Sequence, residues 1–234
     1  MTGMGGRTEQ SPKRAGEPGR VTAPAHCRWV DVIGRNRAQL ERVQTQLALP
    51  ARLVPLSLAE HLRPAAVRVR PAWFLVTHFT APSPRGVFTR RPLYVWLGEH
   101  AIVTITPWAR QTVLETTGEL EETRDDLLCR VVEAAVSSHE EVSRHLNEAF
   151  FAKDRGESPR AWHQKEHRIT VFGQLLDHQL DLLRAVGGGA KMRQLRRQLA
   201  ALAQIAHYAD RKLRQSGCCP LCTHHAALGQ RRGH

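Results

Sequence analysis

The chain has 234 residues, 41% of them hydrophobic, which is enough for one sizeable domain or two small ones. Its 34 Lys and Arg residues outnumber its 22 Asp and Glu residues, and the net charge of +12 admits anionic partners such as nucleic acid or acidic lipid. The longest apolar runs, residues 101–106 and 199–206, fall far short of the roughly 20 residues that a membrane-spanning helix needs. Composition therefore predicts that the chain has no transmembrane segment of its own.

The first residues and the cysteines indicate a cytoplasmic protein. Residues 1–27 are rich in Gly, Pro, Lys and Arg and have almost nothing apolar to bury, so we expect a disordered basic extension without a signal peptide. The five cysteines are an odd number and give no disulfide framework, which fits a reducing compartment.

An α+β head domain is predicted for residues 28–122, built on a mixed sheet that helices cover. Short β-branched or apolar runs ended by Gly or Pro predict strands, and apolar residues at helical spacing predict helices. A loop is expected through Pro82, Pro84 and Gly86. Before this loop we expect, in order, a strand at 29–33, helices at 38–49 and 56–62, and strands at 67–69 and 73–79.

Two further strands, 93–97 and 101–106, are predicted to form an antiparallel hairpin around Gly98-Glu99-His100. Both are almost continuously hydrophobic, so we expect the sheet to be covered on both faces. A polar helix at 109–122 is predicted to follow.

Three long helices are predicted in a stalk region, residues 123–215, before a Cys- and His-containing tail at 216–234. The first covers 125–150, and Gly187 to Gly189 separate the second from the third, so these two are expected to be antiparallel. Each of these helices carries a narrow stripe of apolar residues. Such stripes are typical of long bundles or coiled coils, and we expect another subunit to complete the bundle. The apolar stripes, spaced alternately by three and four residues, are Leu128, Val132, Ala135, His139, Val142, Leu146 and Ala149; Ile169, Phe172, Leu176, Gln179, Leu183 and Val186; and Met192, Leu195, Leu199, Leu202, Ala206, Ala209 and Leu213.

Three groups of residues could carry chemistry. His163 to His167 spell H-x-x-E-H, a zinc-protease pattern that needs a third metal ligand, and polar positions on an exposed helix are the favoured alternative. His139 within an apolar stripe is either a pH sensor or a polar position with a partner. A Zn²⁺ site in the tail is possible, although a tail without fixed structure is the favoured interpretation; its candidate ligands are Cys218, Cys219, Cys222, His224 and His225.

Three segments carry a resemblance when taken in order. Trp29-Val30-Asp31 opens a strand, LGEHAIVT at 97–104 lies in the hairpin, and residues 127–146 open the series of long helices. Together, over about residues 29–214, they resemble the cytoplasmic part of the CorA-type divalent-cation transporter family. The resemblance implies a funnel-building cytosolic domain, at the inner face of the membrane, that assembles as a homopentamer or joins full-length family subunits. It implies a role in Mg²⁺, Co²⁺ or Ni²⁺ transport and a possible regulatory Mg²⁺ held by carboxylates.

The sequence also departs from this family. Members continue into two transmembrane helices with a Gly-Met-Asn signature, whereas this sequence ends in SGCCPLCTHHAALGQRRGH, so we expect a cytosolic domain only, either functional or a truncated remnant. Glu60-His61 stands where members often carry a Glu-Asp pair. Metal ligands are therefore left unassigned; where many members carry acidic residues, this chain has Arg193, Arg196 and Arg197.

A basic nucleic-acid-binding protein is the alternative function, without a recognition motif to support it. No phosphate loop, nucleophile elbow or carboxylate pair stands out, so we do not expect an enzyme. The alternative would use Arg35, Arg37 and Arg42, and on the last helix Arg193, Arg196, Arg197 and Arg211.

Overall fold

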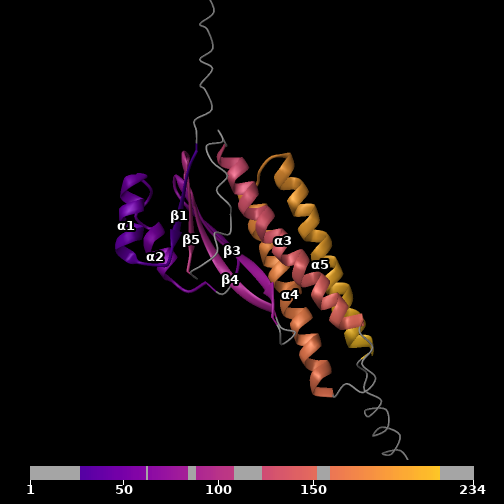
Figure 1. Ribbon diagram of the computed structural model, residues 1–234. Helices are drawn as coiled ribbons and strands as arrows, with labels where there is room; N and C mark the ends of the chain where they lie inside the picture. The colour runs from indigo at the N-terminus through magenta and orange to yellow at the C-terminus, as the bar shows by residue number, and fades with distance from the viewer. Residues whose placement is uncertain (1–26, 62, 84–87, 108–122, 152–158, 217–234) are drawn as a thin grey trace, which may run out of the picture.

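The computed structural model describes residues 27–61, 63–83, 88–107, 123–151 and 159–216. In Figure 1 two short helices lie on one side of a five-stranded sheet and three long helices on the other. The elements are β1 (Arg28–Ile33), α1 (Arg37–Gln46), α2 (Leu53–Leu58), β2 (Ala65–Val69), β3 (Ala72–Pro82), β4 (Phe88–Leu97), β5 (Ala101–Thr106), α3 (Arg124–Phe151), α4 (Pro159–Val186) and α5 (Ala190–Ser216).

The sheet is mixed, in the order β1-β5-β4-β3-β2. β1 is parallel to β5, and all other neighbours are antiparallel. The predicted β4–β5 hairpin is confirmed, with the Gly98 N–H donating to the Ala101 carbonyl at 2.8 Å. A Cβ at Gly98 would lie 2.7 Å from Leu49 Cδ2, so a larger residue in this turn would displace the end of the Leu49 side chain.

β3 and β4 are both longer than predicted. Their pairing continues to Pro82 opposite Phe88, where we expected a loop to begin. The predicted strand began at 93, whereas β4 begins at Phe88 and includes Pro92; β5 pairs only with Tyr94 to Leu97. Pro92 therefore lies where β4 has a neighbour on one side only, and a strand tolerates proline there.

The ends of the two short helices also differ from the prediction. α1 ends at Gln46, because the chain turns through Ala48 with a φ of 49°. α2 begins at Leu53, three residues before the predicted start at 56, since Pro55 lies in its first turn. A proline is tolerated there because the N–H groups of the first turn have no partner within the helix.

Both faces of the sheet are covered, as predicted. One face packs against α1 and α2 through a core that includes Leu40, Leu53, Phe74 and Trp96, and the Trp96 indole N–H donates to Ser57 Oγ at 2.7 Å. The other face shares one hydrophobic core with α3, α4 and α5. The division of the chain at 122 and 123 stays a prediction, but the sheet and the long helices pack as one unit.

The predicted helical stripes form much of this second core. All seven stripe residues of α5 are buried, as are five on α3 and five on α4. They are therefore covered within the chain, and the expectation that another subunit would cover them is corrected. The stripes looked unpartnered in the sequence because their cover comes from other elements: the sheet lies against α3 and α4, and α5 packs on α3 and α4.

α4 and α5 form an antiparallel hairpin (Figure 1). Gly187 and Gly188 make its turn with φ values of 77° and 121°, which favour glycine. None of the helices in the described ranges combines the length and the apolar run needed to cross a membrane. The predicted extension at 1–26, the helix at 109–122 and the tail from 217 onward lie outside the described residues.

Candidate functional site

The three segments that carried the sequence resemblance meet in space. The Trp29 indole N–H donates to Thr104 Oγ1 at 2.9 Å, and the Thr104 hydroxyl donates to Asp31 Oδ1 at 2.8 Å. Arg130 of α3 lies over the Trp29 ring, 5.4 Å from its centre. These contacts join β1, β5 and α3, so the residues position elements of the fold and do not form a ligand site.

Glu60 and His61 follow α2 at the other face of the sheet. His61 Nε2 donates to the Leu56 carbonyl at 2.8 Å, and its ring lies 5.3 Å from Phe74 and 5.8 Å from Tyr94. The guanidinium of Arg35 lies over the Tyr94 ring, 5.2 Å from its centre. His61 therefore packs at the edge of the core between the sheet and α2. Its role at the Glu60-His61 position is one of packing.

His139 of α3 is fully buried where α3 packs against the end of β3 and against α4. The Thr80 hydroxyl donates to the Ser138 carbonyl at 2.9 Å, and Thr80 Oγ1 also lies 3.0 Å from His139 Nδ1. Because the hydroxyl proton is already used, Nδ1 must be the donor to Thr80, and the neutral ring carries a bare Nε2. Within the described part of the chain this Nε2 has no partner, and Phe172 lies against the ring at 6.3 Å.

Burial keeps this region neutral. Desolvation lowers the pKa of His139 from 6.5 to about 3, with a further contribution from His78. On the same strand as Thr80, His78 is also buried, and desolvation followed by the charge of Arg90 lowers its pKa to about 4. Gln179 of α4 donates to Thr77 Oγ1 nearby on β3. The satisfied-partner interpretation of His139 thus holds for one ring nitrogen, and protonation of the other is unfavourable.

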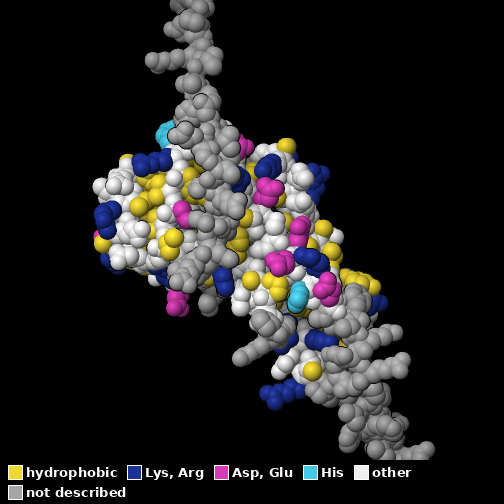
Figure 2. All heavy atoms as spheres, in the orientation of Figure 1, with side chains coloured by type: hydrophobic (Ala, Val, Ile, Leu, Met, Phe, Trp, Pro, Cys, Tyr) yellow, Lys and Arg dark blue, Asp and Glu magenta, His cyan; other side chains and the backbone are white. Residues whose placement is uncertain are grey.

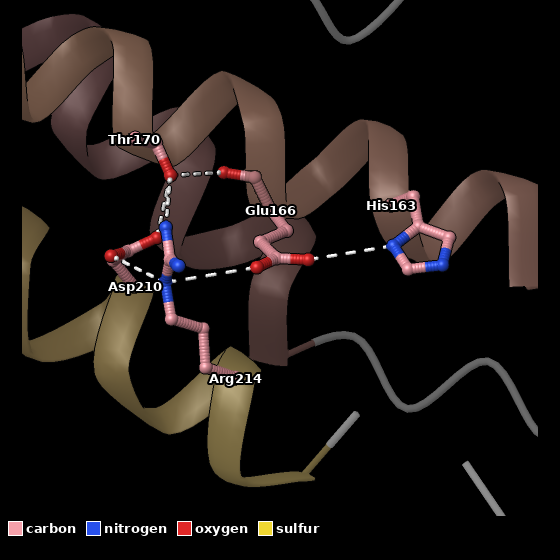
Figure 3. Close-up of polar contacts among 5 residues, drawn as sticks. All are labelled: His163, Glu166, Thr170, Asp210 and Arg214. Atoms are coloured by element: carbon pink, nitrogen blue, oxygen red, sulfur yellow. Dashed lines mark hydrogen bonds and ion pairs between the residues drawn. The ribbon is translucent and has the colours of Figure 1, made fainter. Parts of the chain in front are cut away.

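The H-x-x-E-H segment lies on α4, and its Glu166 faces α5 (Figure 3). Glu166 contacts His163 Nδ1 at 3.5 Å and Arg214 Nε at 3.7 Å. Arg214 also pairs with Asp210 at 3.0 Å, and the Thr170 hydroxyl donates to Asp210 Oδ1 at 2.6 Å. Two carboxylates, one guanidinium and one hydroxyl therefore tie α4 to α5.

This arrangement does not fit a metalloprotease. Glu166 is held by a guanidinium, whereas the general base of such a site must be free to take a proton from metal-bound water. The His163 side chain is 76% exposed and its Nδ1 is directed at Glu166. Across the described ranges no three His, Cys, Asp or Glu side chains come together as a metal site. The candidate zinc ligands of the tail lie outside these ranges.

The arginines of the alternative function are only partly brought together. Arg193, Arg196 and Arg197 line one groove between α4 and α5, joined by Arg184 of α4. Arg211 lies more than three turns further along α5 and does not line it. Arg35 precedes α1, and Arg37 and Arg42 lie within it, on the opposite side of the sheet from α5. The described arginines of this alternative function therefore lie in separate places and do not form one basic surface.

Comparison with solved structures shows which known folds this architecture resembles. No protein-family model matches the sequence, and a search of curated proteins finds no match. The ZntB cytoplasmic domain from Vibrio parahaemolyticus superposes with a TM-score of 0.67 at 11% identity, over 83% of this chain and 87% of that one. The soluble domain of CorA from Methanocaldococcus jannaschii gives 0.65 at 11% identity, over 80% and 84%. The chain has the fold of the CorA soluble domain.

Two full-length structures match this CorA-type fold as well. CmaX gives a TM-score of 0.67 at 10% identity, covering 88% of this chain and 71% of that one. The complete CorA magnesium transporter from Methanocaldococcus jannaschii gives 0.63 at 12% identity, covering 87% and 72%. The sequence resemblance to the CorA type is therefore confirmed at the level of the fold.

Sequence reasoning missed two features of this CorA-type domain. Arg184 was not selected, because it lies on a different helix from the other groove arginines and only the α4–α5 packing brings it to them. The link from Thr80 to His139 was also missed, since 59 residues separate them. A signal for the second was present, because a histidine in an apolar stripe needs a polar partner from elsewhere in the chain.

Proposed function

We propose that this chain acts as the cytoplasmic domain of a divalent-cation transport system. The observation that carries the proposal is the length of the structural match, which spans 83% of this chain and 87% of the ZntB cytoplasmic domain. A match of this extent includes both the sheet and long helices, and so the whole architecture is shared. A fold alone does not define an activity, so the proposal needs its own test.

The proposed role is regulatory and not enzymatic. Two polar clusters of the described residues, Trp29–Thr104–Asp31 and Glu166–Arg214–Asp210, hold elements of the fold together. Mg²⁺ is the first cation to test because the matching CorA is a magnesium transporter. Since the described residues form no three-ligand cluster, a regulatory cation would need ligands from other residues or from a second copy.

We further propose that copies of the chain associate through the outer face of α5. Ile205 and Tyr208 are 44% and 54% exposed, three residues apart on this helix. They are the two large hydrophobic residues that α5 does not bury, and at this spacing they lie on one face. Association would cover them, in contrast to the stripe residues, which the chain already covers.

The molar mass of the purified protein tests this proposal. We expect light scattering after size exclusion to give a multimer whose fraction changes with Mg²⁺ at about millimolar concentration, with Na⁺ at equal ionic strength as the control. Ile205→Arg should shift the protein toward the monomer. Gln46→Arg adds the same charge at an exposed position on α1, on the other side of the sheet, and should leave the mass unchanged. A monomer that is indifferent to Mg²⁺, Co²⁺, Ni²⁺ and Zn²⁺ would count against a cation-responsive assembly.

A further inference from the structure

An open groove lies between α4 and α5, next to the turn of their hairpin. Its volume is about 490 Å³. Figure 2 shows Lys and Arg side chains along the outer edge of the upper part of α5. The residues that line the groove are Leu180, Arg184, Arg193, Arg196, Arg197 and Ala200.

The charges of this groove are largely uncompensated. Arg184 pairs with Asp181 at 3.0 Å. Within the part of the chain that the structure describes, Arg193, Arg196 and Arg197 have no ion pair and no side-chain hydrogen bond to a partner. Arg193 is three and four residues from the other two, so like charges share one helix face, where each such pair is destabilising. The groove therefore holds a net excess of three positive charges without a structural reason for it.

We propose that this groove binds a soluble oligophosphate, an anion with two or more linked phosphate groups. Guanidinium groups bind phosphate oxygens through paired N–H donors, and four of them, from two helices, line this groove. Leu180 and Ala200 provide apolar surface beside these charges, which strengthens their interaction with an anion. This proposal does not depend on the proposed role in cation transport.

The short extent of the basic groove favours a small ligand over a nucleic acid. Arg193 to Arg197 span about 6 Å of helix axis, and the next basic residue on α5, Arg211, is about 21 Å further on. A nucleic-acid surface needs charges that follow the phosphate backbone over several nucleotides. Between Arg197 and Arg211, His207 is already paired with Asp177 at 3.0 Å and so does not extend the basic groove.

Titration calorimetry with inorganic tripolyphosphate tests the site, using the full chain in metal-free buffer at about 0.15 M NaCl. We expect the double variant Arg193→Gln/Arg197→Gln to raise the Kd at least about tenfold. The matched control, Arg211→Gln/Lys212→Gln, removes the same charge from the same helix outside the groove and should change the Kd by less than about twofold. Circular dichroism should show the same helix content for the wild type and both double variants. The single variant Arg197→Gln, titrated in the same way, gives a second measurement of the Kd.

Each other outcome overturns the proposal. Equal weakening in both double variants would mean that tripolyphosphate responds only to the net charge of the chain. Tighter binding of a duplex DNA that also depends on Arg211 would assign these arginines to a nucleic-acid surface. Sedimentation with phosphatidic acid vesicles, lost in the groove variant while tripolyphosphate does not bind, would assign the phosphate to a lipid headgroup.

Discussion

The two ends of the α4–α5 hairpin use arginine in opposite ways. At the end where α5 finishes, Arg214 lies between Glu166 and Asp210, and Thr170 completes the cluster (Figure 3). At the turn end, Arg193, Arg196 and Arg197 share a groove with one another and have no carboxylate among the lining residues. At the first end, acidic partners balance the charge of the arginine. At the second end, the arginine charges remain available to a ligand.

This difference shows how a basic chain can be interpreted once its fold is known. A net charge of +12 does not distinguish arginines that hold helices together from arginines that could bind an anion. The packing of α4 on α5 does distinguish them, because it brings acidic partners to one end only. Substitutions at and between the two ends can therefore test the comparison.

The largest effect of a single substitution is expected midway between the ends. Leu199 is fully buried against the core that α5 shares with the sheet, and Leu199→Ala should lower the free energy of unfolding by about 3 kcal/mol through the lost contacts and the cavity. Ile205→Ala, on the exposed side of the same helix, should cost under about 1 kcal/mol. Chemical denaturation measures both. Equal losses would mean that the ends, and not the shared core, hold the hairpin.

Acid should destabilise the middle of the molecule. The pKa values of His139 and His78 are lowered to about 3 and about 4, so below pH 6.5 the unfolded chain binds more protons than the folded one. The free energy of unfolding is therefore full above about pH 6.5 and falls as pH decreases, by up to ~1.4 kcal/mol per pH unit for each histidine.

Denaturation at a series of pH values measures this slope. His139→Leu should make it shallower between pH 6.5 and 4, whatever its effect at pH 7. His145→Gln removes an exposed histidine from the same helix and should leave the slope unchanged. An identical slope in wild type and His139→Leu would show that His139 does not control the acid response.

A smaller effect is expected at the paired end. Thr170→Val removes a hydroxyl that donates its one proton to Asp210 Oδ1, with the Glu166 carbonyl as the competing acceptor at 3.0 Å, and should cost about 1 kcal/mol of unfolding free energy. Thr45→Val is the matched control, since Thr45 bonds only to the Glu41 carbonyl one turn earlier. Thermal denaturation of both variants compares them. The cluster would be unimportant for stability if the two substitutions had the same effect.

The smallest effect is expected at the groove. Arg197→Gln should leave stability unchanged or raise it by about 0.2–0.5 kcal/mol, because it relieves repulsion from Arg193. Denaturation at low salt, where charge repulsion is least screened, is the appropriate measurement. A clear loss of stability would mean that Arg197 has a structural partner and would remove the contrast between the two ends.

Local pattern predicted much of this fold, and long-range pairing set the limits. The stripes of α3, α4 and α5 and the hairpin at Gly98 followed from spacing within one element. The length of β4 was underestimated because the tolerance for Pro92 depends on where β5 ends. For the groove, three of the four arginines were selected from the sequence, but as a nucleic-acid surface. Arg184 could not be added until α4 was placed beside α5.

Cation uptake by cells is the most direct test of the proposed function. Deleting the gene in the organism that carries it, and measuring accumulation of Mg²⁺, Co²⁺, Ni²⁺ and Zn²⁺, should change the uptake of at least one of these ions. Restoring the wild-type gene should reverse the change, and a Leu199→Ala copy should restore it less well because the domain is less stable. Unchanged uptake of all four ions, in cells shown to produce the protein before deletion, would contradict a role in divalent-cation transport.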